Sequence, residues 1–347
     1  MKKPENINEI EPEIDSQDNL EISITLDDIN LYSRLDKFLS DNLAGHSRTS
    51  IKNLFERGMI SAQNSKGKSE KIELKKMPRN EVTIQVTLPP PLPTSAKAEN
   101  LPLKILFEDE HLLIVNKSAG MVTHPAPGNY NGTLVNAVLH HCPDIGMIGD
   151  QKRPGIVHRL DKGTSGVMVV AKNQKTHEGL VSLFSSHDID REYQCIAMSS
   201  KIRPSGTLQS IIGRDPNNRK KMAAKVQNGK EAITHYKVEE VFDVCSHLKV
   251  TLETGRTHQI RVHLCSLLKA PILNDSTYGN PTQDLKRMDN KFSPLLKEYD
   301  YAFLHARKLG FVHPMTKEHL TFVAEPPHEF QAVLKMLREE NDTADLF

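Results

Sequence analysis

The chain has 347 residues, of which 37% are hydrophobic, and a formal net charge of +1. This length is typical of two domains with sizeable cores, and no part of the sequence approaches the roughly 18 consecutive apolar residues of a membrane span. The first 30 residues carry nine acidic side chains against Lys2 and Lys3, whereas the rest of the chain has 43 basic and 35 acidic residues. This separation of charge favours a nucleic-acid partner for the part beyond the acidic tail.

The cysteines and the N-terminus point away from secretion and from metal binding. The four cysteines form no Cys-x-x-Cys pair, so neither a zinc site nor a disulfide framework is expected. The N-terminus has no apolar segment of the kind that directs secretion. The sequence also has no Walker loop and no dinucleotide-binding fingerprint. We therefore expect a cytoplasmic monomer that needs neither a metal nor a cofactor.

The N-terminal region predicts a small domain over residues 21–88. Residues 1–20 are acidic and poor in aromatics, and we expect them to form a disordered tail. Alternating apolar residues predict strands near 22–26 and at 82–86. A helix is predicted where four apolar residues fall on one face: Leu35, Phe38, Leu39 and Leu43. The Pro-rich segment 89–100 reads as a semi-rigid linker and marks the domain boundary.

A second helix is predicted from Ser47 to just before Gly58. Arg48 and Lys52 occupy polar positions of this helix. Lysine and arginine on one helix face can bind RNA phosphates without reading bases. A solvated basic face on a purely structural domain is the alternative.

The stretch from Pro154 to Gly166 is a polar loop punctuated by glycines and followed by the apolar run 167–171. A short continuous apolar run is typical of a buried strand, and a loop held by buried strands is a rigid carrier of functional groups. The loop presents Asp161 beside Arg159, and a carboxylate fixed in this way can act on a sugar carbon. An ordinary turn, in which the aspartate binds its own backbone, is the structural alternative.

A hydrolase triad is a second alternative for this loop. His158, Asp161 and Ser165 supply the three residue types of a Ser-His-Asp hydrolase. However, no Gly-x-Ser-x-Gly elbow surrounds Ser165, and triads are normally assembled from distant segments.

The second domain is predicted to span residues 101–338, followed by an acidic tail at 339–347. Apolar runs predict strands at 112–116, 167–171, 191–196, 248–254 and 303–323. Helices are predicted at 133–141, at 174–186, after an N-cap at Thr257, and at 329–338. Residues 214–225 form a strongly basic loop.

Several strings of the sequence resemble one family. His158-Arg159-Leu160-Asp161 with Thr164-Ser165-Gly166 resembles the signature of the RluA/RluD family of pseudouridine synthases. Further matches follow in the family's order, at Lys117, Gly120, His124, Pro125, Arg191-Glu192-Tyr193, Gly255 to His263 and Asn274 to Gly279. Ser118 and Asn274 depart from the usual proline and glycine.

The resemblance implies a role for each matching residue. Asp161 would be the catalytic residue, and Arg261 would hold it in place. Arg159 would help to hold the flipped nucleotide, and Tyr193 would pack on the target uracil. The basic loop would contact RNA through Arg219, Lys220 and Lys221.

The N-terminal domain has its own resemblance. Arg34-Leu35-Asp36, Ser47-Arg48, Ile51-Lys52 and Gly58 resemble the small RNA-binding domain named after ribosomal protein S4, although Ala62-Gln63-Asn64 replaces the usual Val-Asn-Gly. The resemblance implies RNA contacts through Arg48 and Lys52.

Together the sequence predicts an α+β protein with a mixed, largely antiparallel sheet in the catalytic domain and a small α/β RNA-binding domain before it. The expected function is isomerisation of specific uridines to pseudouridine, in 23S-type large-subunit ribosomal RNA. The alternatives are the same chemistry on transfer RNA and a non-catalytic RNA-binding or ribosome-assembly protein.

Overall fold

The computed structural model describes residues 18–43, 46, 48–88, 96–126, 128–150, 153–218 and 221–344. The chain divides into two compact units, Met1–Pro93 and Thr94–Phe347, and each has a hydrophobic core of its own. Most of the predicted acidic tail, residues 1–17, lies outside the described residues. Across the part of the chain that the structure describes, every helix is too short or too polar to span a bilayer.

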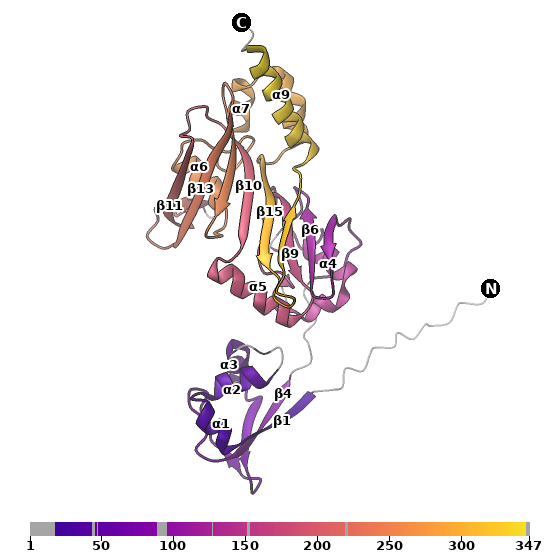
Figure 1. Ribbon diagram of the computed structural model, residues 1–347, viewed down its shortest axis with the longest axis vertical. Coiled ribbons are helices and arrows are strands. Elements are labelled where there is room, and N and C mark those ends of the chain that lie inside the picture. The colour runs from indigo at the N-terminus through magenta and orange to yellow at the C-terminus, as the bar shows by residue number, and fades with distance from the viewer. Residues whose placement is uncertain are drawn as a thin grey trace, which may run out of the picture. The chain divides into compact units, whose positions relative to one another are not determined.

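The N-terminal unit packs helices on a four-stranded antiparallel sheet of order β1-β4-β2-β3 (Figure 1). Its elements are β1 (Asp18–Ile24), α1 (Leu26–Leu31), α2 (Leu35–Asn42), α3 (Arg48–Glu56), β2 (Ile60–Asn64), β3 (Ser69–Glu70) and β4 (Val82–Leu88). The predicted apolar face of α2 is confirmed, because Leu35, Phe38 and Leu39 are buried in the core. Helix α1 was not predicted, because Leu26 was assigned to the strand before it; that strand ends at Ile24, and Leu26 begins the helix.

The C-terminal unit is built on a ten-stranded sheet of order β12-β11-β13-β14-β10-β15-β9-β6-β5, with β16 paired to β15. The strands of this sheet are β5 (Ile105–Glu108), β6 (Leu112–Lys117), β9 (Ser165–Ala171), β10 (Asp190–Ala197), β11 (Ser205–Arg214), β12 (Met222–Ala224), β13 (Lys230–Val241), β14 (Ser246–Leu252), β15 (Leu304–Val312) and β16 (His319–Val323). A separate two-stranded ribbon pairs β7 (Gly149–Asp150) with β8 (Arg153–Pro154).

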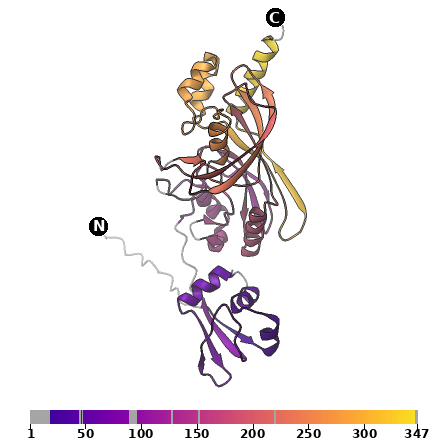
Figure 2. The same ribbon diagram turned by 90° about the vertical axis from the view of Figure 1, so that its left-hand side faces the viewer.

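Helices cover both ends of this sheet. They are α4 (Leu134–His141), α5 (Gln174–Ser186), α6 (Gln259–Ser266), α7 (Pro281–Arg287), α8 (Ser293–Glu298) and α9 (His328–Ala344), with short 3-10 helices at Pro143–Met147 and Asn290–Phe292. Figures 1 and 2 place α7 and α9 at one end of the unit and α4 and α5 at the other; Figure 2 is the view turned by 90°. The predicted mixed, largely antiparallel α+β fold is confirmed.

Strands β6 and β9 are buried on both faces, as their continuous apolar runs predicted. Side chains alternate between the two faces of a strand. In β9, Val167 and Val169 join the core that contains Leu180 of α5, whereas Met168 and Val170 join the core that contains Leu134 of α4. The strand that follows the polar loop of residues 154–166 is therefore packed against a core on each face.

The polar loop of the sequence signature connects β8 to β9. Strand β9 pairs with β15 in parallel, at His305↔Ser165 and Ala306↔Gly166, while the other strand pairs among the described residues are antiparallel. Gly166 has φ +124°, and any side chain there would collide with the backbone of Ala306. Only glycine lets β15 approach the end of the loop this closely.

The prediction that the chain ends in an acidic tail at residues 339–347 is partly wrong. Helix α9 runs from His328 to Ala344 instead of ending at 338. Arg338 makes two hydrogen bonds to Glu240, at 2.6 and 2.7 Å, and Asn341 donates to the carbonyl of Val241. These contacts fix the last turns against β13, and acidic composition alone did not reveal them.

Candidate active site

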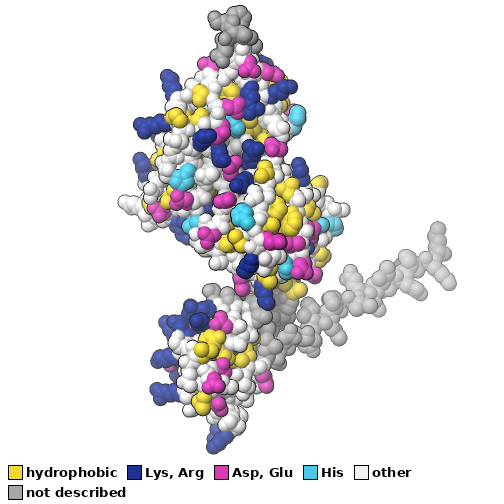
Figure 3. Space-filling view, viewed as in Figure 1, with side chains coloured by type: hydrophobic (Ala, Val, Ile, Leu, Met, Phe, Trp, Pro, Cys, Tyr) yellow, Lys and Arg dark blue, Asp and Glu magenta, His cyan; other side chains and the backbone are white. Residues whose placement is uncertain are grey.

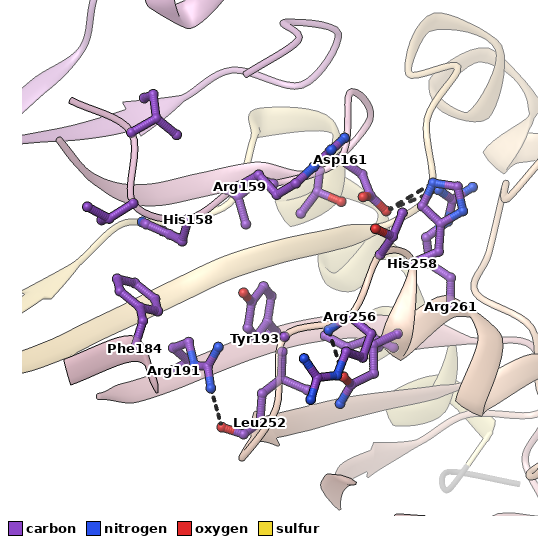
Figure 4. A pocket seen from close by; sticks show the side chains of 18 of the residues that line it. His158, Arg159, Asp161, Phe184, Arg191, Tyr193, Leu252, Arg256, His258 and Arg261 are labelled. Atoms are coloured by element: carbon purple, nitrogen blue, oxygen red, sulfur yellow. Dashed lines mark hydrogen bonds and ion pairs between the residues drawn. The ribbon is translucent and has the colours of Figure 1, made fainter. Parts of the chain in front are cut away.

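A cavity of about 540 Å³ opens at the end of the β8–β9 loop (Figure 4). Its walls come from that loop, from α5, from β10 and from the turn that enters α6. The lining includes five arginines and a single carboxylate: Arg153, Arg159, Arg191, Arg256, Arg261 and Asp161. A concave site with one acid among several fixed cations suits a polyanionic substrate.

Asp161 is held rigidly in this cavity. Its backbone carbonyl accepts from the Thr164 N–H at 3.1 Å, and the Thr123 hydroxyl donates to the carbonyl of Leu160 at 2.9 Å. The side chain is 16% exposed and its Oδ2 lies 3.2 Å from Nη1 of Arg261. The carboxylate can therefore meet a substrate in a fixed orientation.

Arg261 lies between two carboxylates. It donates through Nε and Nη2 to both oxygens of Asp275, at 2.7 and 2.8 Å, and through Nη1 to Asp161. Burial lowers the pKa of Arg261, but the hydrogen bonds and charge of Asp275 outweigh that effect and raise it overall. Burial likewise raises the pKa of Asp275, and the contact with Arg261 more than reverses this. Both groups therefore stay charged inside the protein.

Asp275 was not among the predicted site residues. Its side chain is 0% exposed, and its Oδ1 also accepts from the backbone N–H groups of Thr277 and Tyr278, at 2.9 and 3.0 Å. Asp275 lies in the Asn274 to Gly279 string that resembles the family, but no local pattern marked it as the partner of Arg261.

The structure brings together Asp161, Arg261 and Tyr193, and it places Arg159 on the cavity wall (Figure 4). Arg261, the residue that the resemblance implied, makes the ion pair with Asp161, and the neighbouring Arg159 is exposed. Tyr193 is buried in β10, with burial raising the pKa of its phenol.

The hydrolase triad does not form. His158 accepts the backbone N–H of Val169 through Nε2 at 3.1 Å, and its ring stacks on Phe184. Burial and the charge of Arg191 lower the pKa of His158 to about 3, so it is neutral at pH 7. The hydroxyl of Ser165 instead contacts Nδ1 of His305 at 2.8 Å.

Arg191 is a cavity residue that sequence reasoning did not select. The guanidinium lies over the Phe184 ring and donates to the carbonyls of Leu252 and Glu253, at 3.3 and 2.7 Å. Burial lowers its pKa. A Cβ at Gly255 would stand 2.9 Å from Nη1 of Arg191, so this glycine leaves room for the guanidinium.

The predicted RNA-binding residues lie on both units. Arg48 and Lys52 are exposed on α3, where Arg48 pairs with Asp36 at 2.9 Å and Lys52 with Glu56 at 3.6 Å. Lys221 precedes β12, with its ammonium over the Tyr278 ring. Arg219 and Lys220 lie outside the described residues.

One group of possible metal ligands occurs among the residues that the structure describes: Glu108, His141 and Cys142, with ligand atoms within 4.8 Å of one another. Lys172 and His141 each contact Glu108 at 2.8 Å. Their hydrogen bonds, that of Lys172 first, lower the pKa of Glu108 to about 2. These ion pairs account for the cluster, and we assign no metal to it.

Comparisons with known proteins agree with this site. Residues 111–266 match the family described as RNA pseudouridylate synthase. A protein of Zymomonas mobilis named ribosomal large subunit pseudouridine synthase D is 40% identical over 92% of this chain and 98% of its own length. A protein of the same name from Vibrio parahaemolyticus is 36% identical over 92% and 95%.

A solved structure extends the comparison to the fold. The human RNA pseudouridylate synthase domain containing 4 protein superposes with a TM-score of 0.52 and 26% identity, over 68% of this chain and 93% of that one. The matched region contains the Asp161 loop and the Arg261 helix, and the relatives match over nearly their whole length. The chain therefore belongs to the RluA/RluD family of RNA pseudouridine synthases, the isomerases that convert uridine to pseudouridine in RNA.

Proposed function

We propose that this enzyme isomerises one or a few uridines in the RNA of the large ribosomal subunit. The observation that carries the proposal is the similarity, at 36 to 40% identity and over at least 95% of their length, to two relatives named ribosomal large subunit pseudouridine synthase D. The cavity supports the same chemistry, because its lining has one carboxylate and five arginines that can surround a bound nucleotide.

Asp161 acts on the ribose of the target nucleotide. The reaction breaks the bond from the anomeric carbon to nitrogen 1 of uracil and rejoins that carbon to carbon 5. The proton of carbon 5 is lost and nitrogen 1 gains one, so atoms and charge balance. The carboxylate either attacks the anomeric carbon or removes a ribose proton, and both routes need it fixed beside the sugar. Arg261 holds it there at 3.2 Å.

The other cavity residues hold the base and the backbone. Tyr193 packs against the flipped uracil, a contact worth about 1–3 kcal/mol per base. Flipping a paired uridine costs a few kcal/mol, and Arg159 at the cavity wall stabilises the flipped state. Arg256, in the turn that enters α6, adds positive charge to the cavity wall for a flanking phosphate.

A large RNA would also use surfaces beyond the cavity. We propose that residues 21–88 form an S4-like RNA-binding domain attached to the catalytic domain at 101–338. Lysine and arginine side chains gather along one edge of the N-terminal unit (Figure 3), and Arg48 and Lys52 are exposed on α3. Together with Lys221, such contacts increase affinity when one RNA reaches all of them.

The test maps pseudouridine in all cellular RNA from a strain lacking the gene, and from the same strain carrying the wild-type or the Asp161→Asn chain. We expect one or a few large-subunit rRNA positions to lose pseudouridine and to regain it only with the wild-type chain. An intact rRNA pattern with a missing tRNA position would assign the enzyme to transfer RNA. Restoration of the rRNA positions by Asp161→Asn would contradict the assigned chemistry.

A further inference from the structure

A histidine beside Asp161 has no part in the chemistry described so far. Nε2 of His258 lies 3.9 Å from Oδ2 of Asp161, and the two side chains face each other in Figure 4. His258 is the residue before α6 and has φ +57°, in the left-handed region. This conformation is uncommon outside glycine, and such residues cluster at functional sites where their surroundings hold them.

The hydroxyl of Tyr278 fixes the other side of this imidazole. Its Oη lies 2.8 Å from Nδ1 of His258 and accepts the backbone N–H of Met222, also at 2.8 Å. A hydroxyl that accepts one hydrogen bond still has its own proton to donate. The tyrosine ring is held in turn, since the Arg261 guanidinium lies 5.1 Å from its centroid and the His258 ring packs edge-on at 5.6 Å.

These contacts select one tautomer of His258. Burial is the main cause that lowers the pKa of this imidazole, and the charge of Arg261 adds to it, against the opposing charge of Asp161. The ring is therefore neutral at pH 7 and carries a single proton. If Nδ1 accepts from Tyr278, that proton is on Nε2 and points toward the carboxylate. The other tautomer would turn a lone pair toward the negative oxygen, which is electrostatically unfavourable.

We propose that Tyr278 and His258 are positioning residues for Asp161. The Tyr278 hydroxyl, anchored on the first residue of β12, orients the Nε2 proton of His258 toward the same carboxylate oxygen that Arg261 contacts. The inference rests on the proposed role of Asp161. Arg261 then restrains Oδ2 from one direction and His258 from another, so the reactive carboxylate keeps its orientation when RNA enters.

The experiment is a double-mutant cycle in the full-length chain. Tyr278→Phe removes only the hydroxyl and keeps the ring, and His258→Ala removes the imidazole. Single-turnover rates of pseudouridine formation are measured at saturating RNA, with RNA affinity measured separately. We expect the rate to fall about 10-fold in Tyr278→Phe and about 30-fold in His258→Ala. The 3.9 Å separation is too long for a hydrogen bond in the free enzyme, but catalytic contacts of this kind shorten when the substrate binds, so these values take the range for hydrogen bonds to charged groups. RNA affinity should change less than about twofold in either variant.

The combined variant distinguishes a positioning role of Tyr278 from a purely structural one. If Tyr278 acts through His258, the combined variant is no slower than His258→Ala alone. Losses that multiply would overturn the proposal, because they would show that the hydroxyl merely supports β12 through Met222. A wild-type rate in Tyr278→Phe would also overturn it.

Two further variants serve as controls for this experiment. Tyr236→Phe deletes the hydroxyl of a buried tyrosine in β13, outside the cavity lining, and should leave the rate within about twofold. His258→Gln supplies an amide N–H in place of Nε2 and should restore part of the rate lost in His258→Ala. If the wild-type enzyme is inactive, or if Asp161→Asn is as active as the wild type, the proposed function fails instead.

Discussion

Each unit contains a cluster of arginine and aspartate, and the two clusters have opposite proportions. In the N-terminal unit, Arg34 and Arg48 both bind Asp36, at 2.8 and 2.9 Å. The C-terminal unit has the reverse arrangement, one arginine between two carboxylates: Arg261, Asp275 and Asp161. The first cluster has an excess of positive charge and the second an excess of negative charge.

The two clusters also differ in how far their side chains are exposed. Arg34 and Arg48 are 38% and 53% exposed, so the positive excess faces solvent, where it can meet phosphates. Asp275 is fully buried, so Asp161 is the carboxylate of the second cluster that opens to the cavity, where Arg261 lies beside it. One arrangement suits attraction of RNA, and the other suits presentation of a single reactive carboxylate.

The largest effect is expected from Asp161→Asn, which tests whether the second cluster presents the reactive carboxylate. The substitution keeps the size of the side chain but removes its charge, so turnover should fall by at least about 1,000-fold, which is about 4 kcal/mol of transition-state stabilisation. Single-turnover formation of pseudouridine measures the loss. RNA affinity should hardly change, and a near-normal rate in the purified variant would remove Asp161 from the chemistry.

The second test removes the charge of Asp275, the buried carboxylate of the second cluster. Asp275→Asn removes the fully buried partner of Arg261 and should destabilise the C-terminal unit by about 3 kcal/mol, since breaking a buried ion pair leaves a charge uncompensated. Calorimetry should show this unit unfolding earlier while the N-terminal unit is unaffected.

Glu325→Gln is the matched control for Asp275→Asn. It breaks an exposed pair with Arg307 and should cost less than about 1 kcal/mol. Equal destabilisation by the two substitutions would contradict the importance of burial in the second cluster.

The third test concerns RNA affinity. Arg48→Gln combined with Lys52→Gln should weaken RNA binding and reduce the slope of log affinity against log salt by about 1.5, because each phosphate contact contributes about 0.7 to 0.9. Turnover at saturating RNA should persist. Lys297→Gln with Lys335→Gln removes the same charge from α8 and α9 and should leave the slope unchanged. An equal change in both pairs would mean that α3 has no special role.

The smallest effect is expected in the first cluster at low pH. The hydrogen bond from Arg34 is the main cause that lowers the pKa of Asp36, from 3.8 to about 2. Because the folded-state pKa is the lower one, this carboxylate stabilises the unit above about pH 4 and loses that contribution as the pH falls toward 2. Asp36→Asn should cost about 1 kcal/mol at pH 7, and chemical denaturation should show the difference vanish near pH 2. A pH-independent difference would mean that shape, not charge, is what Asp36 contributes.

The sequence predicted the elements whose signals are local. Strands β6 and β9 are continuous apolar runs, and α2 has a clear apolar face. The start of α6 shows where local reading failed. Thr257 was expected as its N-cap, but His258 is the residue there and makes no side-chain cap. Gln259 accepts the Arg256 N–H instead, at 2.9 Å, a contact that no spacing rule indicates.

The candidate site was predicted only as far as the family resemblance reached. Asp161 and Arg261, 100 residues apart, were paired through that resemblance and not from periodicity. Asp275 and Tyr278 escaped notice because their roles depend on hydrogen bonds between separate segments. Buried polar groups must find partners, but the sequence does not reveal which ones.

The pairing of β9 with β15 has a consequence for how the chain reaches its active form. Ser165 and His305 are 140 residues apart and contact each other directly. Strand β9, which follows the Asp161 loop, therefore has β6 as a neighbour early but lacks its second neighbour, β15, until more than 300 residues have been synthesised. Contacts between such distant segments form late and slow the folding of a domain. A nascent chain on the ribosome would thus expose Arg48 and Lys52 of its N-terminal unit to RNA well before it could modify any uridine.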